Sequence, residues 1–249
     1  MDRSKIKAVL CDIGGVLYIA DKPVPSAVDA IKRIKEHYPV RFLSNTTQVR
    51  SEQIVKTLQE FGFDIKKEEV ITALDTTKAF LQRKQSSAYY LLTDEAKTLF
   101  DDLKALPCRY VVVGDAQENF SYAHMNEAFR RLQEGASLLA IAKNRYFKDG
   151  EGKLSLDTGA YVAALEFSSG KEARVIGKPS KSFYHKACKL LGVLPEEAVM
   201  IGDDIVSDIR GAHDAGLKTV LVRTGKSSAD DLKSGIQPDL IIDSIGDFL

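Results

Sequence analysis

Short apolar runs alternate along the chain with stretches in which apolar residues recur every three or four positions. Such runs are typical of buried strands, and the recurrences are typical of amphipathic helices. Near the N-terminus, the run Ala8–Cys11 stops at Asp12, residues 24–38 carry the helical period, and residues 39–45 form a second run that ends at Ser44. Strands that alternate with helices indicate an α/β fold with a parallel sheet.

The same alternation returns in the last third of the chain. Apolar residues at Phe183, Ala187, Leu190 and Leu191 predict a helix over residues 181–192. The other elements predicted outside the middle of the chain are helices over 51–62 and 207–216 and strands over 197–204, 217–225 and 238–245.

The middle of the chain holds enough structure for a unit of its own. We expect residues 76–175 to form a second α/β domain, inserted into a core domain made of residues 1–75 and 176–249. This region contains an amphipathic helix with Met125, Phe129 and Leu132 on its apolar face and a hairpin with a glycine-rich turn over 146–156. It also contains apolar runs at 88–94, 110–115 and 137–144.

Charge and composition exclude several classes of partner. The 35 basic and 35 acidic residues leave no net charge, so nothing favours nucleic acid or an anionic membrane surface. No apolar run approaches the ~18 residues that span a bilayer, and no signal-peptide segment precedes the first strand. The three cysteines, Cys11, Cys108 and Cys188, have no metal-ligand spacing and predict reduced, buried thiols in a cytoplasmic protein.

Polar residues stand where several predicted strands end. Asp12, Ser44 and Asp203 each end or follow a core strand, and Lys178 follows a short apolar stretch where the chain returns from its middle region. Ligands of open α/β sheets bind beyond the carboxyl ends of the strands. We therefore expect these four side chains to meet at one edge of the sheet.

Each of these residues also has a plainer interpretation when it is taken alone. Serine, asparagine and aspartate are favoured helix caps, and acids suit the first turn of a helix. Lone lysines and acids are commonly solvated surface charges. One or the other of these two interpretations applies to each of the following residues: Asp12, Ser44, Asn45, Lys178, Asp203, Asp204 and Asp208. The combination, rather than any single residue, indicates a site.

The acidic members of the combination point to a metal ion. Asp12, Asp203 and Asp208 would repel one another at one place unless a divalent cation binds there. A ligand set made only of oxygens suits Mg²⁺, which commonly bridges to a phosphate. We therefore expect Mg²⁺ as the cofactor.

The remaining members suit a phosphoryl group. Lys178, the Ser44 hydroxyl and backbone N–H groups would stabilise charge on phosphoryl oxygens, and glycines at Gly14 and Gly15 would let N–H groups come close. A carboxylate at such a site, here Asp12, can be the nucleophile and form an aspartyl-phosphate.

Four segments resemble, in order, the motifs of the haloacid dehalogenase-like hydrolase superfamily. They are "DIGGVL" at 12–17, "FLSNTT" at 42–47, "IGKP" at 176–179 and "IGDDIVSDI" at 201–209. "LDTGAYVAALE" at 156–166 resembles the branch whose cap is inserted after the second motif, found in nucleotide- and sugar-phosphate phosphatases. The resemblance implies a Rossmann-like parallel-sheet core with an inserted α/β cap, and a hydrolase of phosphoric monoesters or phosphoramides.

The resemblance also implies a role for each matched residue on the phosphoryl side. Asp12 looks like the nucleophile, and Ser44, with Asn45 beside it, like the hydrogen-bond donor to the phosphoryl oxygens. Lys178 resembles the cation that balances the nucleophile and the phosphate.

On the metal side, the resemblance implies a set of Mg²⁺ ligands. Asp12, the backbone carbonyl of Gly14 and Asp203 would bind the ion directly. Asp208, with Asp204 as a further candidate, would hold metal-bound water. Members of this branch often pair through their caps, so a homodimer is expected by resemblance alone.

The chain departs from the family pattern at one place. Phosphatases of the family usually carry a second Asp two residues after the nucleophile, as the acid that protonates the leaving group, and here that residue is Gly14. General acid catalysis typically contributes about 10²–10⁴-fold. We therefore expect a slow or selective phosphatase on a small phosphorylated substrate, best on pyrophosphate, phosphoramidates or other good leaving groups.

The sequence argues against two other phosphate-related functions and leaves a third open. A P-loop at "RTGKSS" would need glycine at position 220, where Val220 lies in a predicted strand. A receiver domain would place its acidic pair before the phosphorylated Asp, and such domains are far shorter. The alternative that stays open is a phosphate sensor or interaction scaffold that keeps the fold and little chemistry.

Specificity is expected to lie in the cap. The polar segments 114–122 and 144–159 follow cap strands, where a substrate-facing loop could lie. Asn144, Arg145, Tyr146 and Asp157 are the candidates, although solvated loop is the plainer interpretation for each of them.

Overall fold

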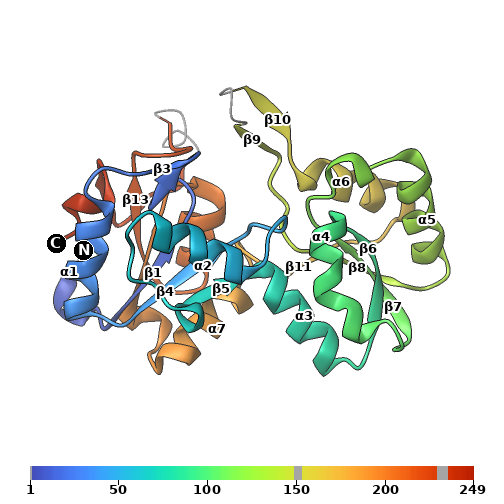
Figure 1. Cartoon of the computed structure of the whole chain (residues 1–249), viewed down its shortest axis with the longest axis horizontal. Coiled ribbons are helices and arrows are strands. Elements are labelled where there is room, and N and C mark those ends of the chain that lie inside the picture. Colours follow the sequence, from blue (N-terminus) through green and yellow to red (C-terminus); the bar gives the residue numbers. More distant parts are fainter. Residues whose placement is uncertain (1, 149–152, 229–234) are drawn as a thin grey trace. The chain divides into compact units, whose positions relative to one another are not determined.

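The computed structural model describes residues 2–148, 153–228 and 235–249 (Figure 1). The chain forms two compact units. Unit 1 comprises Met1–Ser44, Ser51–Ile71 and Lys178–Leu249, and unit 2 comprises Asn45–Arg50 and Thr72–Gly177. The domain limits of 76 and 175 stay a prediction; the units differ from them by a few residues and by the short segment Asn45–Arg50, which belongs to unit 2.

Unit 1 is built on a six-stranded sheet in which the first strand lies near the centre. The strand order is β14-β13-β12-β1-β4-β5, and β1 is parallel to both of its neighbours. The strands are β1 (Ala8–Asp12), β4 (Val40–Ser44), β5 (Val70–Thr72), β12 (Ala198–Gly202), β13 (Lys218–Val222) and β14 (Leu240–Ile242). A parallel sheet with helices on its faces confirms the predicted Rossmann-like core.

The apolar run of β1 reflects its place in this sheet. All five residues of β1 are buried, because strands flank it on both sides and helices cover parallel sheets. The helices of unit 1 are α1 (Ala27–His37), α2 (Ser51–Glu60), α7 (Lys181–Leu191) and α8 (Gly211–Asp214), and a small hairpin pairs β2 (Tyr18–Ile19) with β3 (Lys22–Pro23).

The strand order places a topological switch point between β1 and β12. From β1 the chain proceeds to β4 and β5 on one side, and it later fills the other side with β12, β13 and β14. The register pairs Cys11 with Ile201 and Asp12 with Leu43, so Asp12, Ser44 and Asp203 all stand at the same carboxyl edge. Crevices at such switch points are where open α/β sheets bind ligands.

Two predicted helices differ from the observed ones in detail. α7 buries Phe183, Tyr184, Ala187 and Cys188, whereas Leu190, predicted on the apolar face, is 54% exposed because the buried stripe turns away from it. The helix predicted over 207–216 begins earlier, as a π-helical segment over Ile205–Arg210 that continues into α8.

Unit 2 has a four-stranded parallel sheet of its own. Its order is β11-β8-β7-β6, and every neighbouring pair is parallel. The strands are β6 (Ser87–Leu91), β7 (Cys108–Val113), β8 (Ser137–Ala140) and β11 (Arg174–Val175); the helices are α3 (Ala73–Arg83), α4 (Asp94–Lys97), α5 (Tyr122–Gln133) and α6 (Thr158–Ser169). Leu91, Val111 and Leu132 belong to a core shared by the sheet, α5 and α6.

The predicted hairpin of unit 2 is present as two antiparallel strands, β9 (Tyr146–Lys148) and β10 (Leu154–Leu156). Its glycine-rich turn lies outside the described residues. The prediction that all three thiols are buried is wrong for Cys108, which is exposed because β7 enters the core only at its later residues.

Replacing Leu10 by alanine tests the central position of β1. Leu10 is fully buried, so Leu10→Ala removes apolar contacts and leaves a cavity that costs about 2–5 kcal/mol. We expect the melting temperature to fall by roughly 5–15 °C in thermal unfolding. Leu190→Ala, at an exposed position on α7, is the matched control and should change it little; equal shifts would contradict the burial of β1.

Candidate active site

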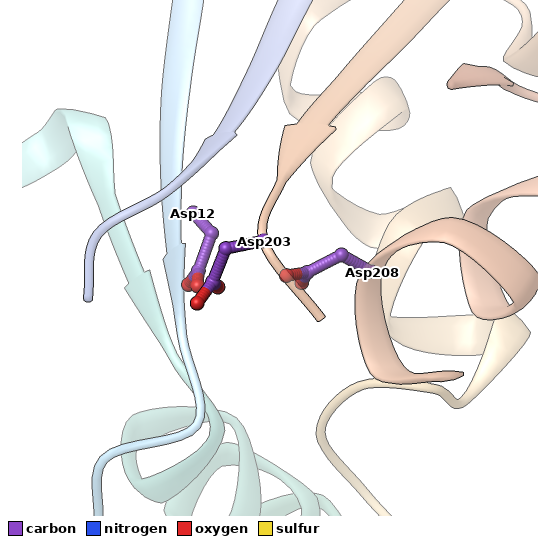
Figure 2. A group of neighbouring side chains, drawn as sticks. All are labelled: Asp12, Asp203 and Asp208. Carbon is purple, nitrogen blue, oxygen red and sulfur yellow. The ribbon is translucent and has the colours of Figure 1, made fainter. Parts of the chain in front are cut away.

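Three carboxylates from distant parts of the chain meet at the switch point of unit 1. Asp12 ends β1, Asp203 follows β12, and Asp208 comes from the π-helical segment. One oxygen of each lies within 4.8 Å of the others, and Figure 2 shows the side chains turned toward one another. Asp203 and Asp208 are buried and Asp12 nearly so. The structure thus brings together the three acids predicted from the sequence.

A buried lysine holds two of these carboxylates. Lys178 Nζ donates to Asp12 Oδ1 at 2.6 Å and to Asp208 Oδ1 at 2.7 Å, and the lysine is only 2% exposed. Burial alone would lower the pKa of Lys178, but the charges of Asp12 and Asp208 raise it well above its usual value. The side chain is therefore an ammonium group at the centre of the acidic cluster.

The loop after β12 fixes the acids by hydrogen bonds. Asp208 Oδ2 accepts from the backbone N–H of Asp204 at 3.1 Å. Asp204 Oδ1 accepts from the backbone N–H groups of Val206 and Ser207, each at 2.9 Å. Asp204 is therefore the cap of the following helical segment, which is the plainer of its two predicted interpretations.

Glycines make room for the carboxylates. A Cβ atom at Gly15 or Gly225 would overlap the Asp203 side chain, and one at Gly202 would overlap Asp208. The N–H of Gly15 donates to the carbonyl oxygen of Tyr18 at 2.8 Å, so it is engaged within the turn. Gly15 itself supplies space and a φ of +80°, and the expectation that N–H groups of this turn come close to a phosphate stays a prediction.

The donor set fits a hard divalent cation. Burial, with the charges of Asp12 and Asp208, raises the pKa of Asp203 to about 8. Burial and the charge of Asp12 likewise raise the pKa of Asp208. The single positive charge of Lys178 therefore does not balance the negative charge of the three carboxylates. Clustered carboxylate oxygens without nitrogen or sulfur donors match the preference of Mg²⁺ and Ca²⁺. Asp12 and Asp203 have oxygens to offer, whereas both oxygens of Asp208 already accept hydrogen bonds.

Ser44 and Asn45 fall on the two sides of a unit boundary. Ser44 ends β4, is buried, and stands one residue beyond the register partner of Asp12. Asn45 begins the part of the chain that belongs to unit 2, where its side-chain oxygen packs against Gly177. The structure thus places Ser44 at the edge of the sheet that carries the acids.

Of the four cap candidates in unit 2, Asp157 has a structural side-chain contact, and the roles of the other three side chains stay predictions. Asp157 Oδ1 accepts from the Thr158 N–H at 2.6 Å as the cap of α6, and the Asn144 carbonyl accepts from the Gly159 N–H at 2.8 Å. The Arg145 carbonyl accepts from the Asp157 N–H at 3.3 Å, and Tyr146 is exposed on β9. None of the four lines the hollow described next.

A hollow of about 360 Å³ in unit 2 was not predicted as such. Asp115 Oδ2 accepts from the Gln48 amide at 2.5 Å, and the Asp115 N–H donates to Thr47 Oγ1 at 2.7 Å. The hollow is lined by Gln48, Asp115, Gln117, Glu118, Phe120, Phe147, Ser155, Leu156, Thr158 and Tyr161. The polar segments 114–122 and 144–159 were both sequence signals for this place, whereas Gln48 gave none.

Comparisons with known proteins agree with this geometry. A family model described as haloacid dehalogenase-like hydrolase matches residues 9–105, and a HAD-hydrolase-like model matches residues 175–248. Human haloacid dehalogenase-like hydrolase domain-containing protein 2 is 42% identical over 227 residues, which are 91% of this chain and 87% of the relative. The chain belongs to the haloacid dehalogenase-like hydrolase family. It is therefore a hydrolase, as the four motifs predicted.

Further members of the family have a similar length and fold. Rat phospholysine phosphohistidine inorganic pyrophosphate phosphatase is 37% identical over 98% of this chain and 93% of its own. The p-nitrophenyl phosphatase from Archaeoglobus fulgidus superposes with a TM-score of 0.89 at 26% identity, over 98% of both chains. NagD from E. coli K-12 gives 0.85 at 26% identity, over 97% of this chain and 98% of its own. The haloacid dehalogenase-like fold with an inserted cap is thereby confirmed.

In the described part of the chain, no helix is long and apolar enough to cross a bilayer.

The raised pKa of Asp203 makes the stability of the metal-free protein depend on pH. A carboxyl whose pKa is about 8 in the folded chain and about 4 in the unfolded chain costs stability progressively as pH rises between these values. Asp203→Asn removes that cost. We expect the variant to melt several degrees above wild type near pH 8 without metal, and the difference to shrink toward pH 5.

Added Mg²⁺ should reverse this order, because it stabilises the wild-type cluster and has one ligand fewer in the variant. Asp214→Asn, at an exposed acid, is the control and should follow wild type at every pH. A melting-temperature difference between wild type and Asp203→Asn that is independent of pH would contradict the assignment.

Proposed function

We propose that this hydrolase is a Mg²⁺-dependent phosphatase that works through an aspartyl-phosphate on Asp12. The observation that carries the proposal is the contact between buried Lys178 and Asp12 at 2.6 Å, inside a cluster of three carboxylates at the switch point of the sheet. Two cationic centres, a lysine and a metal ion, suit a transferring phosphoryl group better than any uncharged substrate.

The two oxygens of Asp12 have different surroundings. Oδ1 accepts from Lys178, whereas Oδ2 has no hydrogen-bond donor among the described residues. Lys178 orients the carboxylate through Oδ1, which leaves Oδ2 as the attacking atom. Oδ1 has a second lone pair, with which it would bind the metal ion. The ammonium also balances the charge that accumulates when a phosphate dianion meets a carboxylate.

Ser44 and Asn45 would bind the phosphoryl oxygens, as the family resemblance implies. The Ser44 hydroxyl at the end of β4 stands at the same sheet edge as Asp12. Preorganised donors of this kind stabilise charge on the equatorial oxygens without reorganisation during the reaction.

Asp12, Asp203 and the Gly14 carbonyl would hold the metal ion, with Asp208 and Asp204 around it. When bound, Mg²⁺ supplies Lewis-acid stabilisation of phosphoryl charge and orients the group for attack. Asp208 has a second duty in the structure, because its Oδ1 accepts from Lys178 and fixes the position of the ammonium.

The substrate is proposed to be a small phosphorylated metabolite, pyrophosphate or a phosphoramidate. At Gly14 the chain lacks the carboxylic acid that would protonate an alkoxide, so good leaving groups are favoured. One relative is named for phospholysine, phosphohistidine and pyrophosphate, and structural neighbours are p-nitrophenyl phosphatases. These names support the same class of substrate. A homodimer through the cap and a cytoplasmic location stay predictions.

Phosphate release from a panel of substrates tests the proposal. With Mg²⁺, we expect turnover of p-nitrophenyl phosphate, pyrophosphate and a phosphoramidate, and little of a sugar phosphate or nucleoside monophosphate. Asp12→Asn should lower each rate by at least about 10³-fold, because an amide cannot serve as the nucleophile. Asp214→Asn should retain wild-type rates. If no substrate of the panel releases phosphate and no burst of covalent phosphoenzyme forms, a phosphate sensor or scaffold would be favoured.

Restoring the missing acid tests the role of Gly14. Position 14 has no positive φ, and no atom lies within 4 Å of a Cβ built there, so a side chain fits. Gly14→Asp should raise turnover of an alkyl phosphate by about 10²-fold or more. Gly14→Ala fills the same space without an acid and should give no increase. If both variants behave alike, protonation of the leaving group is not the limiting defect.

A further inference from the structure

A second lysine stands at the exposed rim of the active site. Lys226 follows β13 in the segment "RTGKSS", and its backbone N–H donates to Asp203 Oδ2 at 2.7 Å. Its Nζ lies 3.8 Å from Asp204 Oδ2, and its side chain is 43% exposed, against 3% for Lys178. Lys178 is a cation of the interior, whereas Lys226 is a cation that an incoming ligand can reach.

Backbone contact brings this segment against the turn that contains Gly14. Gly225 has a φ of +70°, and a Cβ atom there would overlap Asp203 and lie 2.7 Å from the Cα of Gly15. The backbones at 15 and 225 therefore touch beside the same carboxylate. Gly14 and Lys226 are the immediate chain neighbours of this contact. Lys226 thus lies near the place where family phosphatases carry the acid for the leaving group.

The ammonium of Lys226 has hydrogen bonds to offer. Asp204 Oδ2, at 3.8 Å, is beyond hydrogen-bond reach, and no other acceptor for Nζ occurs among the residues that the structure describes. Burial lowers the pKa of Lys226, but the charges of Asp204 and Asp203 raise it more, so the group stays charged. Lys178, by contrast, already donates to Asp12 and Asp208.

We propose that Lys226 binds the leaving group of the substrate when that group is itself an anion, such as the second phosphate of a diphosphate. The inference rests on the proposed phosphatase function and specifies its leaving group. A charged hydrogen bond is about twice as strong as a neutral one, and a second phosphate carries its charge both before and after bond cleavage. A neutral aryl or alkyl group offers Lys226 no such partner when the substrate binds.

The reaction of a diphosphate balances without a general acid. A carboxylate oxygen of Asp12 forms a bond to one phosphorus, and the bond from this phosphorus to the bridging oxygen breaks. Both electrons of that bond stay on the bridging oxygen, which leaves as part of a phosphate ion held by Lys226. Water then hydrolyses the aspartyl-phosphate. This step regenerates the Asp12 carboxylate and releases the phosphate that was bound to it, together with a proton.

The test compares Lys226→Met and Lys226→Arg with Lys218→Met. Lys218 begins the same strand β13, has a similarly exposed side chain (47%), and pairs with Asp239 at 3.0 Å, so it is a matched surface lysine. For each protein, kcat and KM are measured with pyrophosphate and with p-nitrophenyl phosphate. Calorimetry gives the affinities for methylenediphosphonate, which is not hydrolysed, and for orthophosphate, both with Mg²⁺.

Lys226→Met should lower kcat/KM for pyrophosphate by about 10–100-fold, as loss of a charged hydrogen bond implies, and that for p-nitrophenyl phosphate by less than about threefold. It should weaken methylenediphosphonate binding by about tenfold or more and leave orthophosphate binding unchanged. Lys226→Arg should retain most of the preference for pyrophosphate over p-nitrophenyl phosphate. Lys218→Met should have the kcat/KM values and affinities of wild type. Thermal unfolding checks that each variant is folded.

An equal fall in kcat/KM for pyrophosphate and p-nitrophenyl phosphate in Lys226→Met would overturn the proposal, since a residue that only positions Asp203 and Asp204 affects every substrate alike. Unchanged affinity for methylenediphosphonate would overturn it as well. The titration needs no turnover. If wild type hydrolyses neither substrate, the phosphatase proposal fails by itself, and the diphosphonate affinities still decide whether Lys226 binds a second phosphate.

Discussion

The pairing of one buried ammonium group with two carboxylates is the constraint on which the rest of the site depends. Removing a charge from water is costly, and an ion pair inside a protein is tolerated only when its geometry satisfies both partners. Lys178 meets this condition by contacts of 2.6 and 2.7 Å to Asp12 and Asp208, which come from opposite halves of a discontinuous unit. The strand order, the return of the chain at residue 178 and the π-helical turn all serve that convergence.

Much of this could be predicted from the sequence, because the signals are local. Apolar runs indicated the central strands, and the carboxyl-edge rule placed Asp12, Ser44, Lys178 and Asp203 together. Asp208 was added by the argument that clustered acids need a cation. Other features depend on proximity that no local pattern encodes. Gly202 and Gly225 matter because neighbouring carboxylates occupy the space of a Cβ atom. Leu190 had the right period and the wrong face, since burial follows the neighbours of a helix as well as its own repeat.

Lys226 shows the same limit from another side. Its sequence context suggested only a P-loop, which the absence of a glycine at 220 excluded, and nothing local connects it with Asp203. The connection arises because β13 pairs with β12, so that the ends of both strands open at one edge. The site therefore contains two lysines in different environments, one enclosed by acids and one facing water. Both lysines are positively charged, but they differ in burial. Buried Lys178 fixes the positions of the carboxylates, whereas exposed Lys226 can contact the ligand.

The central position of β1 also has a consequence during synthesis. Ala8 pairs with Ala198, so one side of β1 stays without its partner strand until the whole of unit 2 has been made. At about 5–20 residues per second, that interval is on the order of ten seconds or more. An unpaired strand edge of apolar residues is a template for aggregation. The nascent chain therefore carries an unpaired apolar strand edge from its beginning, and this edge is covered only when β12 leaves the ribosome.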